Sequence, residues 1–289
     1  MSNGTPTGKH TGTAAIDTSI AHPARRYEYW LGGKNNFAAD RESGDAIAQV
    51  FPTIRTAALE NRAFAQRAVR WLVTEVGIRQ FIDLGCGIPI SPNTHEVAQA
   101  IAPESRVVYV DNDSIVGVHA RALLTRHPRG RTTFLRADLR DPHDIMHNPQ
   151  LIAGLDFDRP IAVLMNAILH FIPATPNALD GDPDRTAAEL IRSYLNPLPP
   201  GSHLVLTHAT GDHMTPTDAR KITQALTRGG ADFQLRTREQ LAGLLQGQRL
   251  LQPGVVSVTD WRPDDHPQPW SSTEDVSMWA AIASNSADT

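Results

Sequence analysis

The sequence lacks the features that define several whole classes of protein. It has one cysteine in 289 residues, Cys86, which excludes an internal disulfide framework and a zinc site built from thiolates. No stretch approaches the ~18 consecutive apolar residues of a membrane-spanning helix, and the polar N-terminus has no apolar core of the kind found in signal peptides. We therefore predict a cytoplasmic protein with no membrane partner.

Positive charge is not in excess either. Lys and Arg number 27 against 31 Asp and Glu, a net charge of -4, whereas a dedicated nucleic-acid binder carries a basic surface. This balance favours a small-molecule partner over nucleic acid. The length fits one large α/β domain with additions. We expect a tail without structure over residues 1–20, an arm with helices covering the cofactor site over 21–78, and a core domain over 79–285.

Helical periodicity alternates with short apolar runs along most of the chain. Helices are predicted over 55–76, ending at Gly77, and over 95–101, with Ser91 as N-cap and Pro92 in the first turn, and then over 115–126, 185–195, 216–228 and 237–245. Strands are predicted at 81–84, 106–113, 132–136, 161–165, 204–207, 255–258 and 276–282. This order predicts an α/β, Rossmann-like fold with a seven-stranded, mostly parallel sheet and an N-terminal arm and helices.

The segment from Phe81 to Gly87, Phe-Ile-Asp-Leu-Gly-Cys-Gly, is typical of a buried strand that turns on glycines into a helix. Glycines let the backbone approach a ligand closely, and a helix start offers unpaired N–H groups. In an open α/β sheet, ligands bind beyond the carboxyl ends of the strands. The strand-end residues should therefore converge, and they are Asp83, Gly85, Gly87, Asp111, Asp138 and Asn166. Cys86 is interpreted as a small residue fitted into the turn.

The spacing around the glycines indicates which cofactor binds. Asp111 ends the second strand 24 residues after Gly87, near the ~20 expected of an acidic residue that binds ribose hydroxyls. A dinucleotide fingerprint would place a third glycine where Ile90 stands, and no Gly-Lys-Ser/Thr phosphate loop is present. A nucleoside without phosphate remains, and S-adenosylmethionine fits that description.

Three motifs in order, Asp-Leu-Gly-Cys-Gly, Val-Tyr-Val-Asp-Asn-Asp and Arg-Ala-Asp-Leu, resemble those of class I S-adenosylmethionine-dependent methyltransferases. The segments from Arg26 to Phe37 and from Ser91 to Val97 are similar to a largely uncharacterised actinobacterial family of these enzymes, over about residues 22–284. This family usually has Asp-Asn-Phe where the chain has Asn35-Asn36-Phe37, and Leu where it has Trp30.

The resemblance implies methyl transfer from S-adenosylmethionine, with S-adenosylhomocysteine as product. It also implies contacts from Gly85 and Gly87 to the methionine part, from Asp111 to the ribose, from Asn112 to the adenine edge, from Asp138 and Leu139 to the adenine amine and ring, and from Asn166 and Ala167 to the sulfonium.

The segment 25–37 combines aromatic residues, glycines and cations. Its composition fits an aromatic arm packed on the core, while the resemblance favours a cover over the carboxylate of the cofactor, with Tyr27 and Gly32 in contact. Asn61 and Arg62 can reach the same carboxylate, although an exposed helix arginine remains the alternative. His95 either hydrogen-bonds the cofactor or caps its helix.

His170 follows the fourth strand and is the predicted general base, the alternative being a structural histidine packed beside Phe171. His208, Asp212 and His213 follow the fifth strand and are candidates for a second base, but they are too irregularly spaced to predict a metal site. Our leading hypothesis is a methyltransferase of small molecules, in secondary metabolism. The alternative is a regulatory protein or sensor that binds the cofactor without transfer. Methylation of nucleic-acid bases is disfavoured because residues 166–169 lack the Asn/Asp-Pro-Pro-aromatic pattern.

Overall fold

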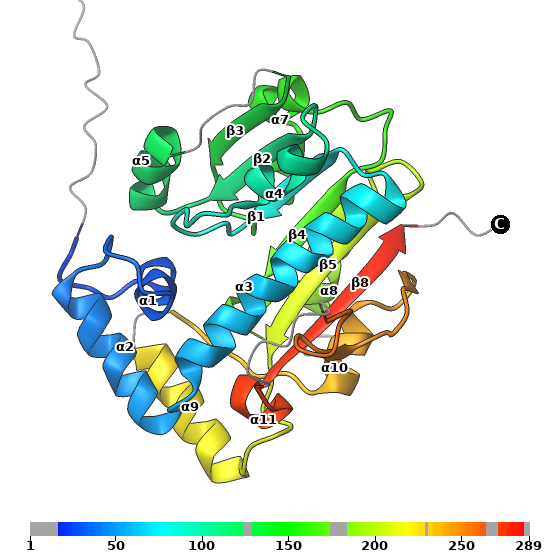
Figure 1. The fold of residues 1–289 in the computed structure, drawn as a ribbon. Helices are drawn as coiled ribbons and strands as arrows, with labels where there is room; N and C mark the ends of the chain where they lie inside the picture. Colours follow the sequence, from blue (N-terminus) through cyan, green and yellow to red (C-terminus); the bar gives the residue numbers. More distant parts are fainter. Residues whose placement is uncertain (1–16, 124–128, 174–183, 229–230, 264–270, 286–289) are drawn as a thin grey trace, which may run out of the picture.

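The computed structural model describes residues 17–123, 129–173, 184–228, 231–263 and 271–285 (Figure 1). Its centre is one sheet in the order β3-β2-β1-β4-β5-β8-β6, with β7 also paired to β8. The strands are β1 (Gln80–Leu84), β2 (Arg106–Asp111), β3 (Arg131–Arg136), β4 (Ala162–Asn166), β5 (Ser202–Ala209), β6 (Arg249–Leu250), β7 (Val256–Ser257) and β8 (Met278–Asn285). The strands from β3 to β5 are parallel and β8 is antiparallel to β5, so the predicted mostly parallel sheet is confirmed.

The last edge of the sheet is more broken than the sequence predicted. The predicted strand 255–258 is only the two-residue β7, and β6 pairs with β8 further along. Between them the chain turns, with Gly254 at φ +88° and its N–H bonded to Leu251 O at 2.8 Å. The two short strands are therefore two pieces of one edge, and they bring the strand count to eight.

Helices lie on both faces of the sheet. They are α1 (Pro23–Trp30), α2 (Ala38–Val50), α3 (Ile54–Trp71), the π-helical turn η1 (Leu72–Val76), α4 (Thr94–Ile101), α5 (Ser114–Leu123), α6 (Pro142–Met146), α7 (Pro149–Gly154), the 3-10 turn η2 (Leu169–Phe171), α8 (Arg185–Leu195), α9 (Pro216–Arg228), α10 (Arg238–Leu244) and α11 (Thr273–Val276). Of the described helices, none is long and apolar enough to cross a membrane.

Alternation along the strands divides the core into two layers. In β1, Ile82 and Leu84 pack toward α6, α7, α8 and α10, whereas Phe81 packs toward α3 and α4. Successive strand side chains point to opposite faces, so each strand contributes to both layers. The long helix α3 crosses the second face, and Gly77 ends it after the π-helical turn, at φ +82°, as predicted (Figure 1).

Two predicted boundaries are wrong for local reasons. The N-cap of α4 is Asn93 rather than Ser91, because its side chain and that of Glu96 form a capping box that closes the first turn. The second strand ends at Asp111 rather than Asp113, because the Asp111 carboxylate accepts from Asp113 N at 2.9 Å and turns the chain out of the sheet.

The N-terminal arm is built from α1 and α2, which lie beside α9 at one end of the molecule (Figure 1). Residues 1–16 of the predicted tail lie outside the described residues. The remainder of that tail is tied to the arm, because Arg25 donates to the carbonyl oxygens of Asp17, at 3.4 Å, and Ile20. The arm thus packs against the carboxyl ends of the strands, where the predicted site residues lie.

Candidate active site

The turn after β1 places two glycines, which have no side chain, in the wall of a cavity. Gly85 and Gly87 have φ angles of +67° and +66°, which residues with a Cβ rarely adopt. A Cβ on Gly85 would lie 2.6 Å from Ile168 Cδ1, so the loop after β4 packs directly on this glycine. A Cβ on Gly87 would meet no atom within 4 Å, because that position faces open space. The glycine turn therefore leaves room for a ligand.

Asp111, at the end of β2, is held against this turn. Its Oδ2 accepts a hydrogen bond from Gly87 N at 2.9 Å, while Oδ1 accepts from Asp113 N. Burial raises the pKa of Asp111, and the two backbone hydrogen bonds oppose that shift. The turn also contains Cys86, and burial raises the pKa of its thiol well above the ordinary value. Cys86 is thus not activated as a nucleophile.

Asp138, after β3, lies on the next part of the wall. Arg140 donates to both of its carboxylate oxygens, from Nε at 2.9 Å and from Nη2 at 2.5 Å. Asn112 Nδ2 donates to Asp138 Oδ2 at 3.3 Å. The Arg140 hydrogen bond is the main reason why the pKa of Asp138 is lowered to about 2. Asp138 and Asn112 thus converge as predicted, and Leu139 lines the same cavity.

A second polar group lies where α3 faces the glycine turn. Asp83 Oδ2 accepts from the Thr94 hydroxyl at 2.7 Å, and burial raises the pKa of Asp83 to about 6. Arg62 Nη2 donates to Pro92 O at 3.0 Å, and burial lowers the pKa of its guanidinium. The charges of Asp83 and Arg62 interact, so the cavity offers one anion and one cation at this place.

The loop after β4 brings a polar group and a histidine to the cavity. Ala167 has φ +50°, and its N–H donates to the Thr207 hydroxyl at 2.8 Å, which holds the turn against β5. Asn166 Oδ1 is buried and has no hydrogen-bond partner in the part of the chain that the structure describes. His170 follows in η2 and also lines the cavity.

His170 is 6% exposed and lies among aromatic rings, with Phe171 at 4.4 Å and Phe233 at 4.8 Å between ring centroids. Its Nδ1 is buried and lacks a partner among the described residues. Burial first, and then the charges of His208 and Arg236, hold the pKa of His170 well below its ordinary value. The ring is therefore neutral over the physiological range.

The turn that carries His170 is held by Arg236, which the sequence analysis missed. The Arg236 guanidinium is 1% exposed and donates to Leu169 O at 3.1 Å and to Ile172 O at 2.9 Å. Its Nε donates to Asp184 Oδ1 at 2.9 Å. One cation thus binds the carbonyl groups on both sides of His170. Arg236 lies in a loop where polar and apolar residues are mixed and belongs to no motif, so no signal in the sequence marks it.

His208 completes this group. Arg236 Nη1 lies 2.8 Å from His208 Nε2, and because a guanidinium only donates, Nε2 accepts. The proton of His208 is therefore on Nδ1, which donates to Ala209 O at 2.7 Å. Burial is the main reason why the pKa of His208 is lowered to about 3. His208 thus has a fixed tautomer.

Asp212 and His213, which follow β5 near His208, both contact Trp279. Asp212 Oδ2 accepts a hydrogen bond from Trp279 Nε1 at 2.8 Å, and the His213 ring packs edge-to-face against the same indole. Among the described residues, no group of three or more His, Cys, Asp or Glu side chains has the arrangement of a metal site.

One cavity of about 540 Å³ collects most of the predicted residues. His170 lines it, and so do eleven of the predicted cofactor contacts: Tyr27, Arg62, Asp83, Gly85, Gly87, Asp111, Asn112, Asp138, Leu139, Asn166 and Ala167. The other two predicted contacts, Gly32 and His95, do not. Gly32 forms the turn that follows α1, at φ +81°. His95 is held away from the cavity, because its backbone N and its Nδ1 are both 2.9 Å from the Tyr109 hydroxyl under α4.

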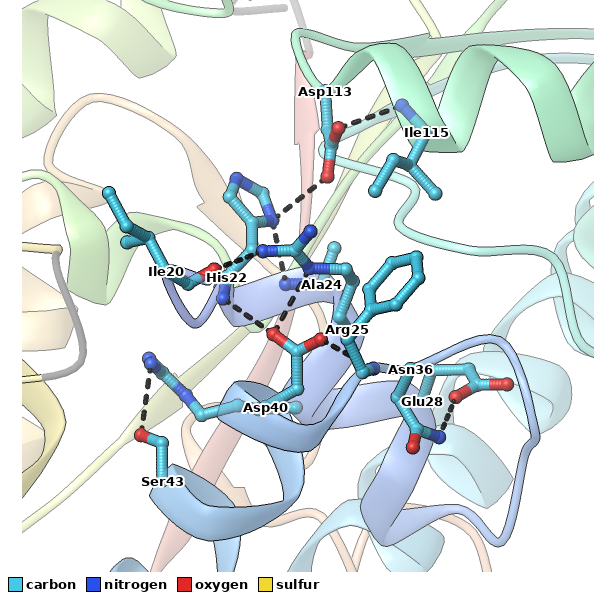
Figure 2. Close-up of polar contacts among 12 residues, drawn as sticks. Ile20, His22, Ala24, Arg25, Glu28, Asn36, Asp40, Ser43, Asp113 and Ile115 are labelled. Atoms are coloured by element: carbon cyan, nitrogen blue, oxygen red, sulfur yellow. Dashed lines mark hydrogen bonds and ion pairs between the residues drawn. The ribbon is translucent and has the colours of Figure 1, made fainter. Parts of the chain in front are cut away.

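The arm forms one wall of this cavity through α1, and Figure 2 shows how it is anchored. His22 Nδ1 lies 3.1 Å from Asp113 Oδ2, which joins the start of α1 to the loop after β2. Within the arm, Arg25 Nε donates to Asp40 Oδ1 at 3.0 Å, and both side chains are buried. The arm is therefore a built part of the cavity wall, held together by the buried Arg25–Asp40 ion pair and joined to the core by the contact between His22 and Asp113.

Comparison with known proteins identifies the family. A family model described as S-adenosyl methyltransferase matches residues 9–286. The chain belongs to this family. This membership confirms the predicted enzyme class, an S-adenosylmethionine-dependent methyltransferase. A search of curated proteins gives no match.

Solved structures agree with this assignment. A DUF574 family protein from Streptomyces avermitilis MA-4680 is 40% identical, with a TM-score of 0.85 over 93% of this chain and 98% of that one. A protein from Thermobifida fusca YX, described as a candidate methyltransferase, is 35% identical, with a TM-score of 0.82 over 96% and 100%. Both sources are actinobacteria, as predicted. An O-methyltransferase family protein from Burkholderia thailandensis, 16% identical with a TM-score of 0.52 over 91% and 64%, shares the fold.

Proposed function

We propose that this S-adenosyl methyltransferase holds its cofactor in the cavity at the strand ends and methylates a small molecule, with His170 as general base. The observation that carries the proposal is the convergence, around one cavity, of the glycine turn, Asp111, Asp138 and Asn166 with His170. The family gives the reaction class, and the proposed residue roles rest on this convergence.

The chain's own residues fit the cofactor. The space that a Cβ on Gly87 would fill is open, and Asp111 beside it offers carboxylate oxygens for ribose hydroxyls. Asp138 and the backbone of Leu139 would hold the adenine. Asp83 and Arg62 have the two charges that complement an amino acid's ammonium and carboxylate groups. Asn166 Oδ1, a buried acceptor, would face the sulfonium.

When bound, S-adenosylmethionine supplies a methyl group that an acceptor takes by in-line displacement. The protein mainly has to hold the acceptor at near-attack distance and exclude water. The arm does the second task by closing the cavity from the side of α1. His170 accepts the acceptor's proton, because its ring is neutral and lies on the cavity wall.

Isothermal titration with S-adenosylhomocysteine tests the foundation of the proposal. We expect binding in the micromolar range, and at least a tenfold loss in Asp111→Ala, with Asp144→Ala on the exposed side of α6 as the matched control. Absence of binding at millimolar ligand would overturn the assignment of the cavity. Binding without turnover of S-adenosylmethionine across a broad acceptor library would favour a cofactor sensor instead.

A further inference from the structure

The cavity extends beyond the predicted methyl-transfer position into a part with apolar walls. We call this part the apolar lobe and define it by Trp30, Phe51, Ile54, Ile222, Leu226 and Phe233. These side chains come from α1, the α2–α3 junction, α9 and the loop before α10, and they belong to one hydrophobic cluster. Phe51 also packs against the sheet layer on the side of α3 and α4.

Four of the six residues of the apolar lobe, Trp30, Ile222, Leu226 and Phe233, are buried at 4–9% exposure, so fold stability accounts for these four but not for the whole cluster. In the two sheet layers the apolar strand side chains are buried, for example Ile82 and Phe81 at 0% exposure. In the apolar lobe, Phe51 and Ile54, together with Met214 and Leu235 beside them, are only half-buried and line the cavity. Apolar surface that faces a water-filled space is unfavourable, so an apolar occupant would stabilise this arrangement.

Charge is distributed unevenly around the cavity. The acidic side chains that line it lie at the cofactor end or, as with exposed Asp232, close enough to Arg140 for their charges to interact. Of the arginines that line the cavity, Arg62 and Arg140 contact residues at the cofactor end, whereas Arg26 belongs to α1 and its Nη1 lies 3.5 Å from the Ser43 hydroxyl within the arm. Asp40 also interacts with the charge of Arg26, but the same carboxylate pairs with Arg25, so the two guanidiniums share one anion within the arm.

The entrance from the apolar lobe to His170 is aromatic. Phe171 and Phe233 both contact the His170 ring, and their own centroids are 5.9 Å apart in an edge-to-face arrangement. The thioether side chains of Met214 and Met278 also line the cavity, and thioethers pack well on ring edges. These neighbours favour a flat aromatic molecule over a flexible aliphatic one.

We propose that the apolar lobe binds an uncharged aromatic acceptor and presents its ring hydroxyl to His170. The inference rests on the proposed function, since it names the substrate class of the same site. In the reaction, the hydroxyl proton passes to His170, the oxygen forms a bond to the methyl carbon, and the carbon–sulfur bond breaks with its electron pair on sulfur. A buried imidazole is a weak base, and a phenol, with a pKa near ~10 as in tyrosine, is the hydroxyl that it can assist.

Binding of 2-naphthol to the protein saturated with S-adenosylhomocysteine tests the class. We expect 2-naphthol to bind at least ~10-fold more tightly than 6-hydroxy-2-naphthoate, which adds a negative charge, and than cyclohexanol, which lacks the ring. Tighter binding of the carboxylate would overturn the uncharged class and assign Arg26 to an anionic acceptor. No binding of 2-naphthol by protein that does bind S-adenosylhomocysteine would overturn this inference and leave the proposed function standing.

Filling the apolar lobe locates the binding site. Ile54→Trp and Met214→Trp should each weaken 2-naphthol binding at least ~10-fold and change S-adenosylhomocysteine binding less than ~2-fold. Both residues are half-buried, so a tryptophan at either position can disturb folding. Two separate variants are therefore tested, and the test stands if one of them does not fold. Ile152→Trp, at a site 52% exposed on α7, is the matched control. Unchanged 2-naphthol binding in both folded variants would contradict the location, and failure to form 2-methoxynaphthalene from bound 2-naphthol and S-adenosylmethionine would contradict the ring-hydroxyl chemistry.

Discussion

The Tyr27 hydroxyl accepts a hydrogen bond from Asn61 Nδ2 at 2.8 Å, and this bond joins α1 of the arm to α3. The same hydroxyl donates its one proton to Ala58 O at 3.0 Å, so Asn61 has to turn its NH2 group toward Tyr27. Asn61 Oδ1 is therefore the atom that remains, buried and without a hydrogen-bond partner in the described ranges. An acceptor in the wall of this cavity suits a hydrogen-bond donor, so we expect Asn61 to bind the ammonium group of S-adenosylmethionine rather than the carboxylate that the sequence suggested.

Asn61→Leu is therefore expected to weaken S-adenosylhomocysteine binding about 10-fold or more, as for a hydrogen bond to a charged group worth about 1.5–3 kcal/mol. Binding of 5′-methylthioadenosine, which has no amino-acid part, should not change. Calorimetric titration with both ligands gives the comparison, and Tyr29→Phe, which removes an exposed hydroxyl bonded to Asp45, is the control. Equal losses for the two ligands would show that Asn61 only supports the fold.

Asp83 gives a pH dependence of stability with a defined sign. Burial raises the pKa of Asp83 to about 6 in the folded protein, above the ~3.9 of an unfolded aspartate. Between these values the folded state holds the proton more tightly than the unfolded state, so this group raises the free energy of unfolding as pH falls from about 6 to about 4. Asp83→Asn should remove this component, measured by urea unfolding across the same window. An unchanged pH dependence would contradict the raised pKa.

Ligand binding at Asp83 should show the opposite trend. If its carboxylate binds the cofactor's ammonium group, binding favours the ionised form, and S-adenosylhomocysteine affinity falls as pH drops through about 6. Titrations at about pH 6 in two buffers of different ionisation enthalpy should detect proton release on binding. Asp83→Asn should bind more weakly and release no proton from this site, whereas release that persists in Asp83→Asn would assign the proton to another group.

The strand-end residues were predictable because their chemistry is local. A turn on Gly85 and Gly87 and an acidic residue at the end of β2 are set by a few neighbouring positions, and parallel strands necessarily end at one edge. The same reasoning explains why His95 was assigned to the cofactor. Its place on the helix after the glycine turn is visible in the sequence, but the Tyr109 hydroxyl that engages it comes from another strand.

The apolar lobe and the support of His170 could not be predicted in this way. Both depend on segments far apart in sequence, because Arg236 reaches back 67 residues to Leu169 and the lobe combines the arm with α9. Hydrophobic periodicity predicts that α9 has an apolar face but not which element covers it. Tertiary packing decides that, so the acceptor side of the cavity required the structure.

Arg236 is expected to set both the position and the proton affinity of His170. Arg236→Met removes a buried cation, so the pKa values of His170 and His208, which that charge lowers, should both rise. Arg236→Lys keeps the charge and loses the planar fork that binds Leu169 O and Ile172 O, so the pKa values should stay low while the turn loosens. Histidine-ring titrations by NMR, with His170→Gln for assignment, measure this difference. Equal pKa values in the two variants would reduce Arg236 to a purely structural role.

Gly33 is predicted to be intolerant of even a methyl group. A Cβ at this position would lie 2.0 Å from Glu28 Oε1, and the buried Glu28 carboxylate accepts from Asn35 N and from Asn36 Nδ2, each at 2.7 Å. Gly33→Ala must displace that carboxylate and leave buried polar groups unpaired, at a cost of about 2–4 kcal/mol in the free energy of unfolding. Gly243→Ala, in α10 where a Cβ meets no atom within 4 Å, is the matched control and should be neutral or stabilising by up to about 1 kcal/mol. Because the Glu28 contacts shape the arm that closes the cavity, Gly33→Ala should also weaken S-adenosylhomocysteine binding, and full stability with unchanged binding would contradict the close packing of Glu28 on Gly33.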